Sequence, residues 1–233
     1  MSAAGRPRVA VVIPVFNERA SLPRVVRDLP ADRVWRTVVV DNGSTDGTDR
    51  IAQELPVSLV REPRRGYGSA CLAGVAFLEP DPPDVVVFLD GDYSDHPDEL
   101  PRLLGAIEEG ADLVIGSRTL GSREPGSMAP QARFGNALAC FLMRLLYGHR
   151  YTDLGPFRAI RWSAYRRLGM RDTNFGWTAE MQVKALRKRL SVAEVPVSYR
   201  RRIGVSKITG TVAGTVRAGY KILWTIARYS VGR

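Results

Sequence analysis

Residues 8–18 of this 233-residue chain read RVAVVIPVFNE, a run of β-branched and apolar side chains that ends in Asn17 and Glu18. A short run that is apolar at almost every position is typical of a strand buried on both faces of a parallel sheet. The polar pair after it marks the carboxyl end of that strand. The stretch therefore predicts a buried parallel strand over residues 8–16.

Two further stretches repeat this pattern of an apolar strand followed by polar residues. RTVVV at 36–40 is followed by Asp41 and Asn42, and VVVFL at 85–89 is followed by Asp90-Gly91-Asp92. Shorter strands are predicted at 57–60 and 113–116, and helices at 21–29, 45–55, 69–78 and 98–109. Strands that alternate with helices predict an α/β fold, with a mostly parallel central sheet covered by helices on both faces.

The alternation changes after residue 116. The later elements we expect are a helix, a short strand, a helix, a strand and a final helix, over residues 133–147, 157–160, 179–190, 192–199 and 211–228. The sequence contains neither a repeat nor a clear linker, so we expect one domain over residues 1–233. Within it we distinguish a first half (8–116), a second half (117–208) and a basic helical tail (209–233).

Composition and charge narrow the class of protein. Hydrophobic residues make up 45% of the chain and charged residues 25%, as in ordinary globular proteins. The two cysteines form no metal or disulfide pattern, and the N-terminus lacks the apolar stretch of a signal peptide, so we expect a cytoplasmic protein. The net charge of +10 is concentrated at the C-terminal end, because residues 184–233 contain 12 Lys/Arg and one acid. Such an end predicts an anionic partner or, alternatively, a solvated basic tail.

The carboxyl ends of neighbouring parallel strands meet at one edge of a sheet, where ligands of this fold class bind. We therefore expect the polar residues after the three long strands to line one cleft. Asp90 and Asp92 stand out, because hard divalent cations prefer carboxylate oxygens and are often shared with substrate phosphates. The alternative for this DGD sequence is an ordinary surface turn.

A glycine-rich segment, RRGYG at 64–68, offers backbone N–H groups that could approach a phosphate closely. It does not follow the first strand, as a dinucleotide fingerprint would, and it lacks the lysine of a P-loop. By itself it is no more than a candidate phosphate-binding loop.

The order of these motifs resembles family-2 glycosyltransferases of the GT-A fold, a Rossmann-like fold, and among them the polyprenyl-phosphate and dolichol-phosphate hexose synthases. The resemblance spans residues 8–210. It rests on the ordered segments IPVFNE, VVVDNGSTDGT, RRGYGSA, LDGDYSDHPDEL, VIGSR, DLGPFRA and YRRRIGVSK.

The resemblance implies that the first half binds a nucleotide-sugar, with either UDP or GDP as the nucleotide. The implied donor contacts are Pro14, Asn17, Glu18, Asp41, Arg65, Gly66, Asp90, Gly91, Arg202 and Lys207. Asp90 and Asp92 would hold Mg²⁺ or Mn²⁺ with the diphosphate. Asn42 departs from the second aspartate that is usual in this family.

The resemblance also places the acceptor in the second half of the chain. The implied acceptor contacts are Arg118, Arg133 and Ser206, and Asp90, Asp92 and Arg118 would be the catalytic residues. Arginine suits a phosphate, since its fork of donors matches phosphate oxygens. The motif spacing does not decide which of Arg200, Arg201 and Arg202 contacts the diphosphate.

These implications define a metal-dependent, inverting hexosyltransferase that acts on a polyprenyl phosphate. Because an acceptor phosphate is already ionised at neutral pH, the enzyme would mainly position it and neutralise charge. The alternative is a hydroxyl acceptor, which needs a carboxylate base, and the candidates for that base are Glu180 and Asp153.

The final predicted helix bears on the localisation. Arg217, Lys221, Trp224 and Arg228 share one helical face, and a basic stripe with a tryptophan suits the headgroup region of an anionic membrane. A second face would carry Val212, Val216, Tyr220, Leu223 and Ala227. We therefore expect peripheral contact with the cytoplasmic face of a membrane. We expect no nucleic-acid partner. A nucleic-acid-binding surface would interleave its basic residues with exposed aromatics, and the predicted metal cleft is acidic instead.

Overall fold

The computed structural model describes residues 6–204 and 212–230, with the side chains of the second segment described from residue 217. A seven-stranded sheet lies at its centre, in the order β3-β2-β1-β4-β6-β5-β7. The strands are β1 (Val9–Val15), β2 (Arg36–Asp41), β3 (Ser58–Arg61), β4 (Val85–Phe88), β5 (Leu113–Ser117), β6 (Arg158–Arg161) and β7 (Val192–Pro196).

The strand pairing makes the sheet mostly parallel, as predicted. β1 runs parallel to β2, with Val15 opposite Asp41, and parallel to β4, with Val12 opposite Phe88. Only β6 is antiparallel to its neighbours, β4 and β5. The chain leaves β1 toward β2 and β3 on one side and returns to β4 on the other. This reversal creates the crevice at the carboxyl ends of β1 and β4 where ligands of open α/β sheets bind.

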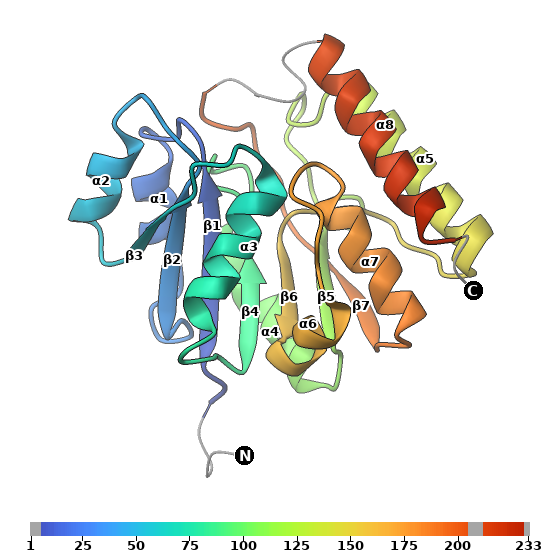
Figure 1. The fold of residues 1–233 in the computed structure, drawn as a ribbon, viewed down its shortest axis with the longest axis horizontal. Helices are drawn as coiled ribbons and strands as arrows, with labels where there is room; N and C mark the ends of the chain where they lie inside the picture. The colour runs from blue at the N-terminus through green and yellow to red at the C-terminus, as the bar shows by residue number, and fades with distance from the viewer. Residues whose placement is uncertain (1–5, 205–211, 231–233) are drawn as a thin grey trace.

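Helices cover both faces of the sheet (Figure 1). They are α1 (Leu22–Arg27), α2 (Thr48–Glu54), α3 (Tyr67–Leu78), the 3₁₀ turn η1 (Pro97–Glu99), α4 (Leu100–Glu108), α5 (Pro130–Tyr147), α6 (Trp162–Leu168), α7 (Trp177–Arg187) and α8 (Val212–Arg228). The last of these, α8, packs against α5 and α7 rather than on the sheet.

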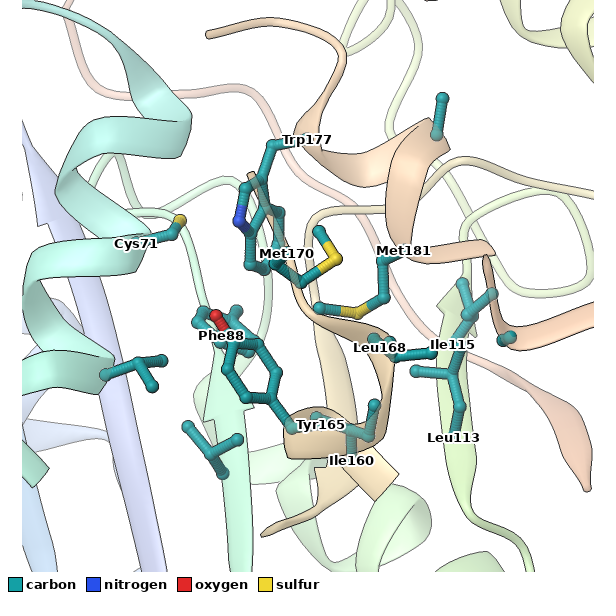
Figure 2. Packing of buried hydrophobic residues seen from close by; sticks show 14 of the residues in the cluster. Cys71, Phe88, Leu113, Ile115, Ile160, Tyr165, Leu168, Met170, Trp177 and Met181 are labelled. Carbon is teal, nitrogen blue, oxygen red and sulfur yellow. The ribbon is translucent and has the colours of Figure 1, made fainter. Parts of the chain in front are cut away.

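Two apolar clusters form the core, one on each face of the sheet. One cluster packs Phe88 of β4 against Trp177 of α7, whose ring centroids are 4.5 Å apart, and reaches Cys71 of α3 (Figure 2). The other includes Leu22 of α1 and Leu103 of α4. The apolar strands contribute side chains to both clusters, which explains why they lack the alternation of a half-exposed strand.

The expected strands are all present, but two features of the helices were not predicted. The short helix α6 was not expected, although its Trp162, Tyr165 and Leu168 are buried at helical spacing. The face of α8 that carries Tyr220 is not its buried face, because Tyr220 is 68% exposed while Thr225 and Ile226 are buried. The contacts with α5 and α7 select the buried face, and periodicity within the helix alone could not reveal them. Within residues 6–204 and 212–230 no helix is long and apolar enough to cross a membrane.

Candidate active site

The loops after β1, β2 and β4 meet at the crevice, which confirms that the three polar clusters converge. The Asn42 N–H donates to the carbonyl oxygen of Val15 at 2.9 Å, and the Asn17 N–H donates to Ser44 Oγ at 3.0 Å. Gly91 lies against Val15. The second and third of the predicted clusters, after β2 and β4, are therefore both in contact with the end of β1, which the first cluster follows.

The loop after β1 is held by its own polar side chains. Asn17 has a left-handed backbone (φ 57°), and its Oδ1 accepts from the Thr45 N–H at 2.8 Å. Glu18 is buried, and its Oε2 accepts from Ser21 Oγ at 2.9 Å. Pro14 is buried inside β1, opposite Val40. These residues shape the floor of the crevice, where the resemblance places the nucleoside.

Asn42 connects β2 to the glycine-rich loop. Its Nδ2 donates to the carbonyl oxygens of Glu62 (2.9 Å) and Arg64 (2.8 Å), and its Oδ1 accepts from the Gly66 N–H at 2.8 Å. An aspartate could not donate to two carbonyls, so the departure from the family's usual aspartate has a structural reason. The preceding Asp41 accepts from the Ser44 N–H at 3.1 Å.

The glycine-rich loop forms one rim of the crevice. The Arg65 guanidinium lies 3.6 Å from the centroid of the Phe16 ring and is exposed. Gly66 has φ 145° and precedes α3, and a Cβ at this position would overlap the carbonyl oxygen of Thr173. The backbone of this rim is therefore locked against the loop before α7, while the Arg65 side chain faces solvent.

The carboxylate pair depends on the glycine between its members. A Cβ on Gly91 would lie 2.6 Å from Val15 Cγ1, so only glycine lets this turn pack against β1. Asp92 is buried, and its Oδ1 accepts from the Ser94 N–H (2.9 Å) and Ser94 Oγ (2.5 Å). Its Oδ2 pairs with Nη2 of Arg202. The turn is thus a built feature of the crevice and not an exposed loop.

Asp90 differs from Asp92 in having an unsatisfied oxygen. Its Oδ1 is buried and accepts no hydrogen bond from the residues that the structure describes. Burial raises the pKa of this carboxyl group, although Arg202 and Tyr67 act against the shift. In the same residues, three or more His, Cys, Asp or Glu side chains nowhere gather as a metal-binding group. A pair of carboxylates nevertheless fits Mg²⁺ or Mn²⁺, since such ions are commonly held by one or two carboxylates plus substrate phosphates.

A third carboxyl group, Asp95, is a site residue that the sequence did not predict. It is 1% exposed, and neither of its carboxylate oxygens has a hydrogen-bond partner among the described residues. Burial and the charge of Asp90 raise its pKa to about 8. Its only sequence signal is its place in SDHP, directly after the carboxylate pair.

The segment after β7 brings one arginine onto the carboxylate pair. Arg200 is not that arginine, because it donates to backbone carbonyls, from Nε to Tyr93 at 2.7 Å and from Nη2 to Asp95 at 3.0 Å. The Arg201 N–H donates to Glu124 Oε2 at 2.8 Å. Of the three candidates, Arg202 is thus the one beside Asp92. The predicted contacts Ser206 and Lys207 lie outside the described residues.

Arg118 is fixed by a buried carboxylate. Its backbone N–H and its Nε donate to Asp153 Oδ2, each at 2.8 Å, and its Nη2 donates to Oδ1 at 2.7 Å. Burial acts to lower the Arg118 pKa, but the charge and hydrogen bonds of Asp153, together with the charges of Tyr199 and Asp95, outweigh it and the pKa ends above its ordinary value. Asp153 therefore acts as the counter-ion of Arg118, and this role leaves it poorly placed to accept a proton from an acceptor.

A pocket of about 460 Å³ opens beside this ion pair, between the loop after β5 and the start of α5. Arg133 lines it, as does Arg123, which the sequence did not single out. Its other lining residues are Thr119, Met128, Pro130, Phe134, Asn136, Ala137 and Thr152. The pocket thus combines two cations with an apolar wall, and none of the described residues that line it is acidic.

Glu180, the other candidate base, does not face this pocket. It is buried, its Oε1 pairs with Lys184 Nζ at 2.7 Å, and its Oε2 accepts from the Asp172 N–H at 2.7 Å. Tyr229 of the segment after α8 also donates to it, at 2.8 Å. Burial acts to raise the Glu180 pKa, but these donors outweigh it and lower the pKa below 4.5. Its position indicates a structural role, joining the loop before α7 to α8.

Comparison with known proteins agrees with this geometry. The sequence profile described as glycosyl transferase family 2 matches residues 10–172. An uncharacterized glycosyltransferase of Mycobacterium tuberculosis is 38% identical over 90% of this chain and 94% of its own length. The polyprenol monophosphomannose synthase of Mycolicibacterium smegmatis is 32% identical over 88% of this chain and 82% of its own length.

Among solved structures, the glucosyl-3-phosphoglycerate synthase of Mycobacterium tuberculosis, in complex with Mn²⁺, UDP and phosphoglyceric acid, has a TM-score of 0.77 at 20% identity. That alignment covers 97% of this chain and 79% of the other. The likeness shows the same GT-A arrangement of sheet and helices. The family profile and the close relatives together show that the chain belongs to glycosyl transferase family 2.

Proposed function

We propose that this enzyme transfers a hexose from a UDP- or GDP-sugar to a polyprenyl phosphate, with inversion at the anomeric carbon. The observation that carries the acceptor assignment is the pocket beside Arg118. Arg123 and Arg133 supply charge for a phosphate, whereas Met128 and Phe134 supply apolar surface for the first isoprene units. A water-soluble sugar hydroxyl would require neither feature. The 32% identical polyprenol monophosphomannose synthase supports the same acceptor class.

The donor would occupy the crevice above β1 and β4. Its nucleoside would lie over the floor formed by Pro14, Asn17 and Glu18, near Asp41, and its diphosphate would lie at the carboxylate pair, within reach of Arg65 on the rim. Asp90 and Asp92 would hold Mg²⁺ or Mn²⁺, which when bound offsets the charge of the departing nucleoside diphosphate. The unsatisfied Oδ1 of Asp90 supports this assignment, because a buried carboxylate oxygen without a partner is costly.

Arg202 would change partner when the donor binds. In the structure its guanidinium neutralises Asp92. A cation at the carboxylate pair would take over that role and free Arg202 to bind the diphosphate, as the resemblance of this segment to the family's loop implies. Arg118, held by Asp153, would present its remaining donor edge at the border between donor and acceptor.

The reaction would need no general base. An ionised acceptor phosphate attacks the anomeric carbon directly, and the enzyme contributes alignment and charge neutralisation. The alternative, a hydroxyl acceptor, requires a free carboxylate at the acceptor site. The two candidates, Asp153 and Glu180, are both buried and engaged, and neither lines the pocket. This distribution supports the phosphate acceptor.

The test is product analysis by mass spectrometry after incubation with GDP- and UDP-hexoses, polyprenyl phosphate in detergent and a divalent cation. We expect a polyprenyl-phosphate hexose from at least one donor. Arg133→Gln should raise KM for the polyprenyl phosphate about tenfold, the loss of one charge-assisted contact, without a matching change in donor KM. Arg24→Gln, an exposed arginine on α1, is the matched control. Transfer to a hydroxyl compound, with none to any polyprenyl phosphate, would overturn the proposal.

A further inference from the structure

The outer faces of α5 and α8 carry most of the exposed apolar side chains of the described structure. Among the residues described, eight large apolar side chains are exposed, and five of them lie on these two helices. They are Phe134 (71%), Phe141 (59%), Leu145 (68%), Tyr220 (68%) and Trp224 (51%). We call these five residues the apolar ridge. A concentration of this kind on neighbouring elements marks an interaction surface.

The two helices lie side by side at one edge of the molecule, away from α1 and α2 (Figure 1). Tyr147 Oη donates to the carbonyl oxygen of Ile226 at 2.6 Å and ties their C-terminal ends together. The exposed residues of α5 are spaced at 134, 141 and 145, so they share one face, opposite the buried Ala139 and Met143. The ridge is therefore carried by two helices that are in direct contact.

Charge on the two helices is of one sign only. They contain five cations, Arg133, Arg144, Arg217, Lys221 and Arg228, and no aspartate or glutamate. Only Lys221 has an acidic partner in the described structure, Asp172 at 3.0 Å. The ridge is thus bordered by arginines that are free to meet external anions.

A basic pocket of about 510 Å³ adjoins the ridge at Trp224. Among the described residues that line it, six are cations and two are acids. The cations are Arg167, Arg171, Lys184, Lys188, Lys221 and Arg228, and the acids are Asp172 and Glu180. Each acid is already paired with a lysine of the pocket. The pocket therefore keeps an excess of positive charge next to an aromatic side chain that is half exposed.

From these observations we infer that α5 and α8 dock the enzyme onto an anionic lipid bilayer, with the apolar ridge entering the interface and the basic pocket holding lipid phosphates. Tryptophan, tyrosine and arginine are the side chains that favour the headgroup region. A second copy of this chain fits less well, because a symmetric contact would place the same arginines against each other with no acid on either helix. The inference is independent of the acceptor and of the transfer chemistry.

Phe134 connects the apolar ridge to the pocket beside Arg118. The same side chain belongs to the ridge and to the wall of the pocket beside Arg118. A bilayer in contact with the ridge would therefore border the mouth of that pocket. A lipid-borne phosphate could reach Arg133 without leaving the membrane.

The test is co-sedimentation of the full chain with sucrose-loaded vesicles, with neither donor nor polyprenyl phosphate present. We expect binding to phosphatidylcholine vesicles that contain about 30 mol% phosphatidylglycerol, and weaker binding when salt rises from about 0.1 M to about 0.5 M. The variant Phe141→Ser/Leu145→Ser should lower the partition coefficient at least tenfold. Phe77→Ser on α3, also exposed (41%), should bind like the unmodified protein.

A charge variant tests the electrostatic part separately. Lys188→Gln/Arg228→Gln should bind anionic vesicles about thirtyfold more weakly, since each of the two lost cations contributes on the order of 1 kcal/mol. Far-UV circular dichroism and the unfolding midpoint of each variant control for misfolding. Absence of binding by the unmodified protein, or equal binding by the Phe141→Ser/Leu145→Ser variant, would overturn the inference. So would a dimer in sedimentation velocity that the same variant dissociates. Because no transfer is measured, failure here is distinguishable from failure of the proposed reaction.

Discussion

Glu180→Gln separates a structural glutamate from a catalytic base. In the structure the carboxylate pairs with Lys184 at 2.7 Å and accepts from the Asp172 N–H at 2.7 Å and from Tyr229 Oη at 2.8 Å. Glutamine removes the charge and turns one acceptor into a donor that faces other donors. Breaking a buried pair of this kind costs about 3–5 kcal/mol. Because glutamine keeps one acceptor oxygen, we expect a loss near the lower end, about 3 kcal/mol.

The measurement is urea unfolding followed by far-UV circular dichroism, with thermal unfolding as a second readout. For a chain of this size, 3 kcal/mol corresponds to a fall of about 6–12 °C in Tm. Glu54→Gln, at the exposed end of α2, is the matched control and should leave Tm unchanged within about 1 °C.

The pH dependence gives the same prediction a sign. The native pKa of Glu180 is lowered from 4.5, so its stabilising contribution is complete above pH 4.5 and is lost as pH falls through the native value. The difference between the unmodified protein and Glu180→Gln should therefore shrink in acid. An unchanged free energy of unfolding, together with a loss of more than about a thousandfold in kcat, would refute the structural role and indicate a base.

Three further predictions concern the crevice. Asp95→Asn should stabilise the metal-free protein by on the order of a few kcal/mol at about pH 8.5 but little at about pH 4, as measured by thermal unfolding at both pH values. The reason is that the native pKa of Asp95, about 8, lies above its ordinary value of 3.8, so the folded protein is destabilised as pH rises above 3.8. In a urea titration, Gly68→Ala should lower the free energy of unfolding by about 1–3 kcal/mol, because the added Cβ would overlap the Asp172 carbonyl group. The control Gly105→Ala, whose Cβ would have no atom within 4 Å, should raise the free energy of unfolding slightly. Arg202→Gln should tighten Mn²⁺ binding to the donor-free protein about threefold to tenfold, because Arg202 competes with the ion for Asp92. An unchanged Mn²⁺ affinity in an electron paramagnetic resonance titration would show that the Arg202–Asp92 ion pair does not compete with the ion.

Much of the fold and part of the site were predictable because their signals are local. The apolar runs before Asn17, Asp41 and Asp90 each predict a buried strand, and the geometry of parallel sheets then brings their polar ends together. The carboxylate pair needed no further information, since a glycine between two aspartates after a buried strand is visible in the sequence. The order of the motifs was sufficient for the family, which the profile match confirms.

Other site features depended on residues far apart in the chain. Asp92 meets Arg202 across 110 positions, and no spacing rule distinguishes Arg202 from its two neighbours. Arg123 and Arg133 face one pocket only because the loop after β5 folds back onto α5. The unexpected function of Asn42 likewise appears only when the glycine-rich loop is seen against β2.

The sequence by itself therefore determined the strands, the position of the carboxylate pair and the family, because each is encoded in the chemistry of consecutive residues. Only the tertiary structure decided which charges are already paired and which faces remain exposed. It engaged Asp153 and Glu180 as counter-ions, and it buried Ile226 of α8 while leaving Tyr220 in solvent. The physical reason is that burial and pairing are properties of contacts between distant segments, which local propensity and periodicity do not contain.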